Sequence, residues 1–260
     1  ISRIEKYFQC PFGYFLNNGL KLQECQPWKI SGADTGDLLH WAVCEYCKAV
    51  DGKSDNPKEK KANWNERTDE ESKTLISNIM EKVCASMEFS EYEEEKTKNV
   101  LDKIKQALEK SVKIVNLSMK NGKYTGAGYE VEFSEKEIKN SEGLVKIKGI
   151  IDRVDIYEDF DAGKAYIRII DYKSGEKGYK RERILNKVDL QLMVYAIAAV
   201  DMYKEKAFAG LSGELEPEIK GVFYDKINKN LIECEYSEGF GAEDLWIKNA
   251  KLDGRVFSPE

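Results

Sequence analysis

Two stretches of the sequence each end an apolar run in an aspartate. Residues 149–151 lead into Asp152, and residues 169–170 lead into Asp171, which Lys173 follows two positions later. Both stretches are typical of β-strands, and side chains alternate along a strand, so Asp171 and Lys173 should point to one side. A buried charge is costly unless it is solvated, paired or metal-bound. If the strands pair, Asp152 joins the other two on one face.

This set of residues fits metal-dependent hydrolysis of a phosphodiester. Carboxylate oxygens are preferred by Mg²⁺ and Mn²⁺, and such an ion lowers the pKa of water and offsets phosphate charge. Lys173 can orient or help deprotonate the attacking water. Glu130, on the preceding predicted strand, is a further candidate, as an outer ligand or a charge partner. For each aspartate a simpler alternative stays open, namely an ion pair with Arg153 or Lys173.

The hydrophobic periodicity predicts the elements that must position these residues. Helices are expected at 2–15 with a break at Pro11, 34–49 with Asp34 as its cap, 66–87, 92–121, 188–203 and 242–250, and strands at 129–133, 145–157, 165–173, 221–226 and 231–236. This order favours an α+β fold, with a central mixed sheet flanked by helices and an N-terminal helical elaboration. We expect one domain over residues 1–260, mainly helical in 1–125 and containing the sheet core in 126–260.

Composition narrows the class of protein. The chain has 260 residues and a formal net charge of −6, which argues mildly against non-specific binding of polyanions. Basic residues nevertheless gather in the predicted loop 175–187. There is no apolar run long enough to span a membrane and no basic-then-apolar leader. We therefore expect a cytoplasmic protein with reduced cysteines, and the start at Ile1 suggests a piece of a longer chain.

Three features carry little information alone. His40, the single histidine, lies one turn after Gly36 in a predicted helix, where a structural role is the simpler interpretation. Cys44 and Cys47 have CxxC spacing but no second pair nearby, which favours ordinary helix residues over a metal or redox pair. Tyr7, Phe8, Phe12, Tyr14 and Phe15 form a dense aromatic group near the N-terminus, and we interpret that group as a small core.

Four motifs occur in a fixed order along the chain. They are Gly36-xxx-His40, Gly149-Ile-Ile-Asp152-Arg153, Asp171-Tyr172-Lys173-Ser174-Gly175 and Gln191-Leu-Met-Val-Tyr195. Each is weak alone, but together the set resembles the RecB-type branch of the PD-(D/E)XK, or restriction-endonuclease-like, nucleases. The opening residues 2–15, with Cys10-Pro11-Phe12, are similar to the start of the C-terminal nuclease domain of AddB, which belongs to the AddAB helicase–nucleases.

The resemblance implies a role for each matching position. The metal ligands would be His40, Asp152, Asp171 and the backbone carbonyl of Tyr172, with Mg²⁺ or Mn²⁺ as the cofactor. Lys173 would be the catalytic lysine and Glu130 an active-site carboxylate. Gln191 and Tyr195, four residues apart and so on one helix face, would support the site and contact DNA; ordinary helix surface is the alternative. The basic residues Lys177, Lys180, Arg181 and Arg183 would contact single-stranded DNA delivered by an AddA-type helicase subunit.

The resemblance also bears on whether the protein carries an iron–sulfur cluster. Cys10 would be the first of four cysteine ligands to a [4Fe–4S] cluster, whose other ligands form a C-terminal group that does not occur before Glu260. We therefore expect the cluster to be absent from this chain, although a longer parent protein can carry one. The expected function is a DNA exonuclease domain of a helicase–nuclease in double-strand-break repair. The alternatives are a DNA-binding domain that has lost cleavage, and a stand-alone RecB-like exonuclease of CRISPR or phage type.

Overall fold

The N-terminal part of the chain is helical, as predicted. The structure, a computed structural model, describes residues 2–22, 32–52, 64–86, 94–140, 143–173, 178–186, 189–227 and 252–257. The first elements are α1 (Ser2–Gln9), α2 (Pro11–Tyr14), the π-helix η1 (Phe15–Gly19), α3 (Gly32–Val50), α4 (Asp69–Ser86) and α5 (Glu94–Asn121). None of the helices in these ranges is both long enough and apolar enough for a transmembrane span.

The second part of the chain builds one mixed sheet. Its elements are β1 (Thr125–Asn140), β2 (Gly143–Asp159), β3 (Lys164–Lys173), α6 (Arg181–Leu185), α7 (Gln191–Lys204), β4 (Glu216–Lys226) and β5 (Asp253–Val256). The strands lie in the order β1-β2-β3-β4-β5. Only β3 and β4 are parallel, and α7 lies in the crossover that joins them, as parallel pairing requires. The predicted α+β class with a central mixed sheet is confirmed.

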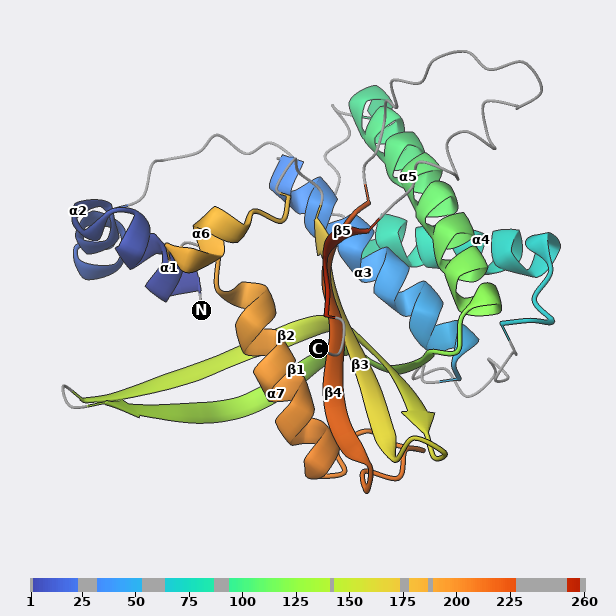
Figure 1. Cartoon of the computed structure of the whole chain (residues 1–260). Coiled ribbons are helices and arrows are strands. Elements are labelled where there is room, and N and C mark those ends of the chain that lie inside the picture. The colour runs from blue at the N-terminus through green and yellow to red at the C-terminus, as the bar shows by residue number, and fades with distance from the viewer. Residues whose placement is uncertain are drawn as a thin grey trace, which may run out of the picture.

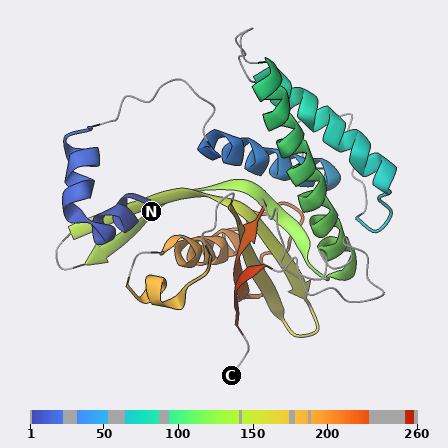
Figure 2. The same ribbon diagram turned by 90° about the horizontal axis from the view of Figure 1, so that it is seen from above.

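Helices cover both faces of the sheet. On one face α3, α4 and α5 pack over a core that includes Tyr129, Ile170 and Tyr172. On the other face α7 packs over a second core that includes Ile151 and Ile169. Figure 2, viewed from above, shows the two layers of helices on opposite sides of the strands. The strands between these two cores are therefore buried on both faces.

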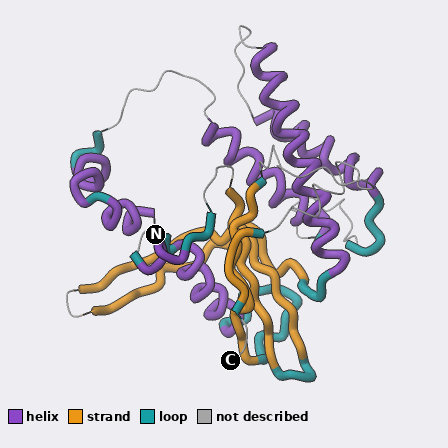
Figure 3. The backbone as a smooth tube through the Cα atoms, turned by 45° about the horizontal axis from the view of Figure 1, so that its top comes forward, coloured by secondary structure: helices purple, strands orange, loops and turns teal. Residues whose placement is uncertain are grey.

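The pairing of β2 changes partway along the strand. It is paired with β1 from Gly143 to Ile156, but with β3 only from Arg153 onward, where Arg153 faces Ile170. The outer halves of β1 and β2 consequently leave the sheet as a two-stranded ribbon, seen in Figures 1 and 3. We call the point where β2 and β3 separate the fork. The next residues beyond the last pair are Asp152 and Asp171, one on each side of the fork.

Several local predictions were wrong. Helix α3 begins at Gly32, so Asp34 lies inside its first turn and is not its cap. The N-terminal aromatic group is no core, because Tyr7, Phe8, Phe12 and Phe15 are all exposed.

Other differences concern the C-terminal half. Strand β4 starts earlier than predicted, at Glu216, and the short helix α6 and strand β5 were not foreseen. The predicted strand 231–236 and helix 242–250 lie outside the described residues.

Candidate metal centre

At the fork, the side chain of Asp152 accepts a backbone hydrogen bond that a neighbouring strand would otherwise accept. Beyond Arg153, β3 no longer has β2 as its ladder partner, and the backbone N–H of Tyr172 donates instead to Asp152 Oδ2 at 2.8 Å. This hydrogen bond satisfies a backbone donor that would be costly to bury alone. Gly149, earlier in the same motif, leaves room for Phe133 of β1, since a Cβ there would lie 3.0 Å from Phe133 Cε1, closer than an ordinary contact.

Asp171 and Lys173 meet on one side of β3, as the alternation of side chains predicts. Their side chains form an ion pair, and Asp171 is fully buried. The side-chain amide of Gln191 joins both: its Oε1 accepts from Lys173 Nζ at 3.3 Å, and its Nε2 donates to Asp171 Oδ1 at 2.8 Å. Gln191 Nε2 also lies 3.0 Å from the buried hydroxyl of Tyr195. Gln191 and Tyr195 are therefore not ordinary helix surface.

His40 reaches the fork from α3, on the other side of the sheet. Its Nε2 lies 3.4 Å from Asp152 Oδ2 and, within the described part of the chain, is buried without a hydrogen-bond partner. Its ring lies 5.6 Å from that of Tyr172, between centroids. Burial lowers the pKa of His40 below its ordinary 6.5, against the opposing pull of nearby carboxylates. At neutral pH the imidazole is therefore neutral and can offer a lone pair to a metal ion.

Burial also dominates the electrostatics of Asp152. It raises the pKa of this carboxyl to about 6, although the Tyr172 N–H and the Lys173 ammonium both act in the opposite direction. The Asp152 carboxylate is partly desolvated and lies close to the His40 imidazole, which has no hydrogen-bond partner among the described residues, so a positive ion beside both groups would stabilise them. The arrangement therefore fits a cation, and its oxygen donors suit Mg²⁺ or Mn²⁺.

Glu130 approaches the same region from β1. Its backbone has a φ of 51°, a left-handed conformation that non-glycine residues rarely adopt, especially in a strand. Its carboxylate accepts from Lys48 Nζ at 2.8 Å. One ligand atom each from His40, Cys44 and Glu130 lies within 4.8 Å of the other two. Glu130 thus lies beside the site and forms an ion pair with Lys48.

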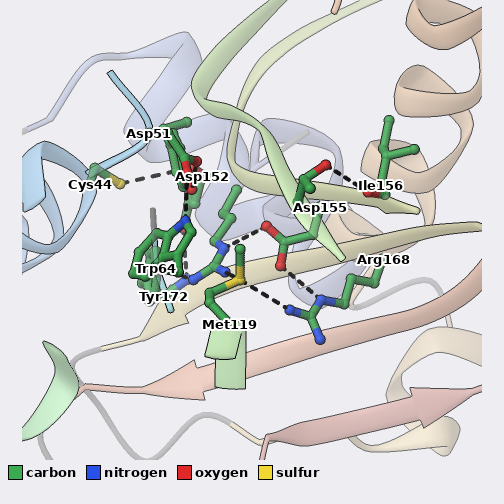
Figure 4. A network of polar contacts seen from close by, with 12 residues as sticks. Cys44, Asp51, Trp64, Met119, Asp152, Asp155, Ile156, Arg168 and Tyr172 are labelled. Carbon is green, nitrogen blue, oxygen red and sulfur yellow. Dashed lines mark hydrogen bonds and ion pairs between the residues drawn. The ribbon is translucent and has the colours of Figure 1, made fainter. Parts of the chain in front are cut away.

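Cys44 is the least suitable member of this group for a hard cation. It is fully buried, and its Sγ lies 3.8 Å from the backbone oxygen of Asp152, as Figure 4 shows. Burial raises the pKa of the thiol well above its ordinary value, so the sulfur stays protonated. Cys47, the other half of the CxxC pair, is also a buried free thiol. Both are packed helix residues, in keeping with the simpler interpretation of the motif.

A buried ion network behind the fork holds the β2–β3 pairing. Asp155 Oδ1 accepts from Arg153 Nε at 2.8 Å, and its Oδ2 accepts from Arg168 Nε at 2.7 Å (Figure 4). Burial would raise the pKa of Asp155, but the two guanidiniums together keep it below its ordinary value. Arg153 therefore pairs with Asp155 and not with Asp152. Of the two simple ion pairs that the sequence left open, only the one between Asp171 and Lys173 is present.

The remaining predicted site residues are less closely tied to the fork. Lys180 and Arg181 are exposed next to and within α6, whereas Arg183 donates to Asp189 at 3.1 Å. Lys177 lies outside the described residues. Cys10 is an exposed free thiol that caps α2, since its Sγ accepts from the Gly13 N–H at 3.3 Å.

Sequence reasoning missed two residues that matter here. Lys48, which pairs with Glu130, follows His40 and Cys44 at intervals of four, so all three lie on one face of α3. That spacing could have identified it. Glu5, on α1, is connected to the start of α7 by hydrogen bonds from the Leu190 and Gln191 N–H groups. No local signal links residues so far apart in sequence.

Comparison with known proteins agrees with this geometry. The chain matches the PD-(D/E)XK nuclease superfamily over residues 1–235. It is 31% identical to the B subunit of the ATP-dependent helicase/deoxyribonuclease of Caldanaerobacter subterraneus subsp. tengcongensis, over 98% of this chain and 22% of that protein. The corresponding protein of Clostridium kluyveri is 30% identical, over 99% of this chain and 22% of its own length. The chain thus spans about a fifth of these relatives, and it belongs to the PD-(D/E)XK nuclease superfamily.

Proposed function

We propose that this chain is a metal-dependent deoxyribonuclease domain that hydrolyses phosphodiester bonds at the fork. The observation that supports it best is the convergence of Asp152, Asp171, Lys173 and His40 from three separate elements, two strands and a helix. This set of residues would lower the stability of an ordinary core, because it buries carboxylates next to an imidazole that has no hydrogen-bond partner within the described residues.

The residues of the site divide the work. His40, Asp152, Asp171 and the Tyr172 carbonyl would hold Mg²⁺ or Mn²⁺, which when bound supplies charge neutralisation and lowers the pKa of water. Lys173 would orient the attacking water and offset charge on the phosphate.

Two neighbouring residues, Gln191 and Glu130, would support the site in different ways. Gln191, bonded to both Asp171 and Lys173, fixes the angle between them. Glu130 would be a nearby carboxylate whose charge Lys48 moderates.

The finer assignment rests on the resemblance of the sequence motifs and on the name of the relatives. We propose that the substrate is single-stranded DNA, cleaved as by an exonuclease, and that residues 1–260 form one nuclease domain working in the cytoplasm. The name of the relatives joins a helicase to a deoxyribonuclease, which supports a role beside a helicase. From the resemblance of the motifs we further propose an AddA-type partner protein and a role in repair of double-strand breaks. Lys177, Lys180, Arg181 and Arg183 would then contact DNA phosphates, with affinity falling as salt rises. Cys10 would ligate a [4Fe–4S] cluster only in a longer parent protein.

Cleavage of single-stranded DNA in Mg²⁺ tests the assignment. Replacing Lys173 by alanine should leave the protein folded and lower the cleavage rate by about 10²- to 10⁴-fold, the usual range for a group that assists proton transfer. The control is Lys164→Ala at the other end of β3, because Lys164 also pairs with a carboxylate, Glu218, at 2.9 Å. The control should cleave like the unchanged chain. Full activity of Lys173→Ala would overturn the assignment.

A binding domain without cleavage makes a different prediction. It would bind DNA but would need no cation at the fork. A titration with Mn²⁺ separates the two proposals, since the enzyme must bind the ion and bind it more weakly when Asp152 or His40 is replaced.

A further inference from the structure

The start of α7 is stabilised by a carboxylate from the other end of the chain. Glu5 Oε1 accepts from the Leu190 N–H at 2.8 Å and from the Gln191 N–H at 3.1 Å. The first N–H groups of a helix have no partner within it, and the helix dipole favours a negative charge beside them. Glu5 thus fills the role of an N-terminal cap for α7, across 185 and 186 residues of sequence. Figure 1 shows α1 near that end of α7.

The two described residues just before α7, residues 189 and 190, do not provide this cap. Leu190 is the N-cap residue and has no side chain that can accept a hydrogen bond. Asp189, the residue before it, accepts from Arg183 Nε at 3.1 Å. Within the described residues, Glu5 therefore supplies a cap that these two residues do not.

Glu5 is also an exception within its own segment. Among residues 3–22 it is the one buried side chain, 9% exposed, and the only other residue of this segment packed against the sheet core is the partly buried Ile4. The other residues between 3 and 22 are exposed or half-buried. Burying a charge on an otherwise exposed helix is costly unless it is well hydrogen-bonded, and the two N–H groups of α7 meet that requirement.

The capped residue is the one that organises the catalytic pair. The backbone N–H of Gln191 donates to Glu5, and its side chain forms hydrogen bonds with Asp171 and Lys173. We propose that Glu5 is a positioning residue for the nuclease site: it fixes the first turn of α7 so that Gln191 holds Asp171 and Lys173 at the right angle. This inference rests on the proposed function. It makes the docking of α1 a condition for efficient cleavage.

The first test measures turnover. Glu5→Ala should lower kcat by about 10- to 100-fold, as small misplacements of catalytic groups do, with KM nearly unchanged. Glu5→Gln keeps an oxygen that can accept both N–H groups and should restore most of kcat. The control is Glu158→Ala, which removes a carboxylate that accepts from the Ser212 N–H at 2.9 Å. Its stability should fall without loss of kcat.

A double-mutant cycle shows whether Glu5 acts through Gln191. In a Gln191→Ala background, Glu5→Ala should cause little further loss of kcat, because the side chain that it positions is already gone. Losses that simply multiply would show that Glu5 affects folding or another group, and would overturn the proposal.

A second readout does not depend on nuclease activity. In an NMR spectrum of the metal-free chain, Gln191→Ala identifies the Gln191 side-chain amide signal by its disappearance. Glu5→Ala should move that signal toward the position of a solvent-exposed glutamine, and Glu158→Ala should leave it in place. An unmoved signal in Glu5→Ala refutes the positioning role. If the signal moves but the unchanged chain cleaves no DNA with any divalent ion, the proposed function fails and the structural coupling stands.

Discussion

Replacing Asp152 by asparagine tests whether the buried carboxylate destabilises the metal-free protein and is kept because it binds a metal ion. Burial raises the pKa of Asp152 from 3.8 to about 6, a rise of roughly 2, and each pKa unit corresponds to about 1.36 kcal/mol. The ionised carboxylate therefore costs the metal-free protein about 3 kcal/mol at pH 7. Asparagine removes the charge and keeps an oxygen for the Tyr172 N–H. Without metal, Asp152→Asn should be more stable than the unchanged chain by up to this amount.

The pH dependence of this effect has a definite sign. The folded state binds the Asp152 proton more tightly than the unfolded chain does, so its contribution to stability is fully present below about pH 4. It is lost as pH rises through about 6. The gain from Asp152→Asn should accordingly be small near pH 4 and complete near pH 7. His40, whose pKa is lowered, acts in the other direction and destabilises the fold below about pH 6.5 in both proteins.

Metal should reverse the order of stability. An ion that binds only the folded state at a concentration of 1,000 Kd adds about 4.1 kcal/mol to the unchanged chain, which is more than the advantage of the variant in EDTA, and the variant should gain almost nothing. The assay is urea unfolding at pH 7 in EDTA and in Mg²⁺ or Mn²⁺, with Asp161→Asn in the exposed β2–β3 turn as a charge-matched control. The reasoning is refuted if Asp152→Asn is the less stable protein in EDTA, or if both proteins respond equally to the ion.

Three further substitutions examine the surroundings of the fork. His40→Ala should weaken Mn²⁺ binding by about 10-fold or more without unfolding the chain, and an unchanged Kd in a titration would exclude His40 as a ligand. Asp155→Asn leaves two guanidiniums underpaired and should cost about 3–5 kcal/mol in urea unfolding, whereas a loss under about 1 kcal/mol would contradict the network. Cys44→Ala should leave Mg²⁺ affinity intact because the thiol stays protonated, and a large loss of affinity would show that the sulfur is a ligand.

Local periodicity accounts for the parts of the site that could be predicted. Asp171 and Lys173 share a strand face, and Gln191 and Tyr195 share a helix face, because both rules depend only on neighbouring residues. The two strands and α7 are therefore found close to where the apolar patterns place them.

The remaining features depend on long-range packing. The fork exists because β3 stops pairing with β2 at Arg153, and residues that are local in sequence do not show where that pairing stops. Lys48 meets Glu130 only because α3 crosses β1. The aromatic residues of α1 and α2 were expected in a core, yet their composition does not reveal that the segment lies at the edge of the molecule with one buried carboxylate.

The most direct test of the central claim is cleavage of single-stranded DNA labelled at its 5′ or 3′ end, with Mg²⁺, Mn²⁺ or EDTA. The unchanged chain should cleave with either ion and not in EDTA. Asp171→Asn should remain folded and lose cleavage in every condition, because the buried carboxylate that holds Lys173 and Gln191 would be gone. Cleavage that persists in EDTA, or in a folded Asp171→Asn protein, would contradict a metal-dependent site at the fork.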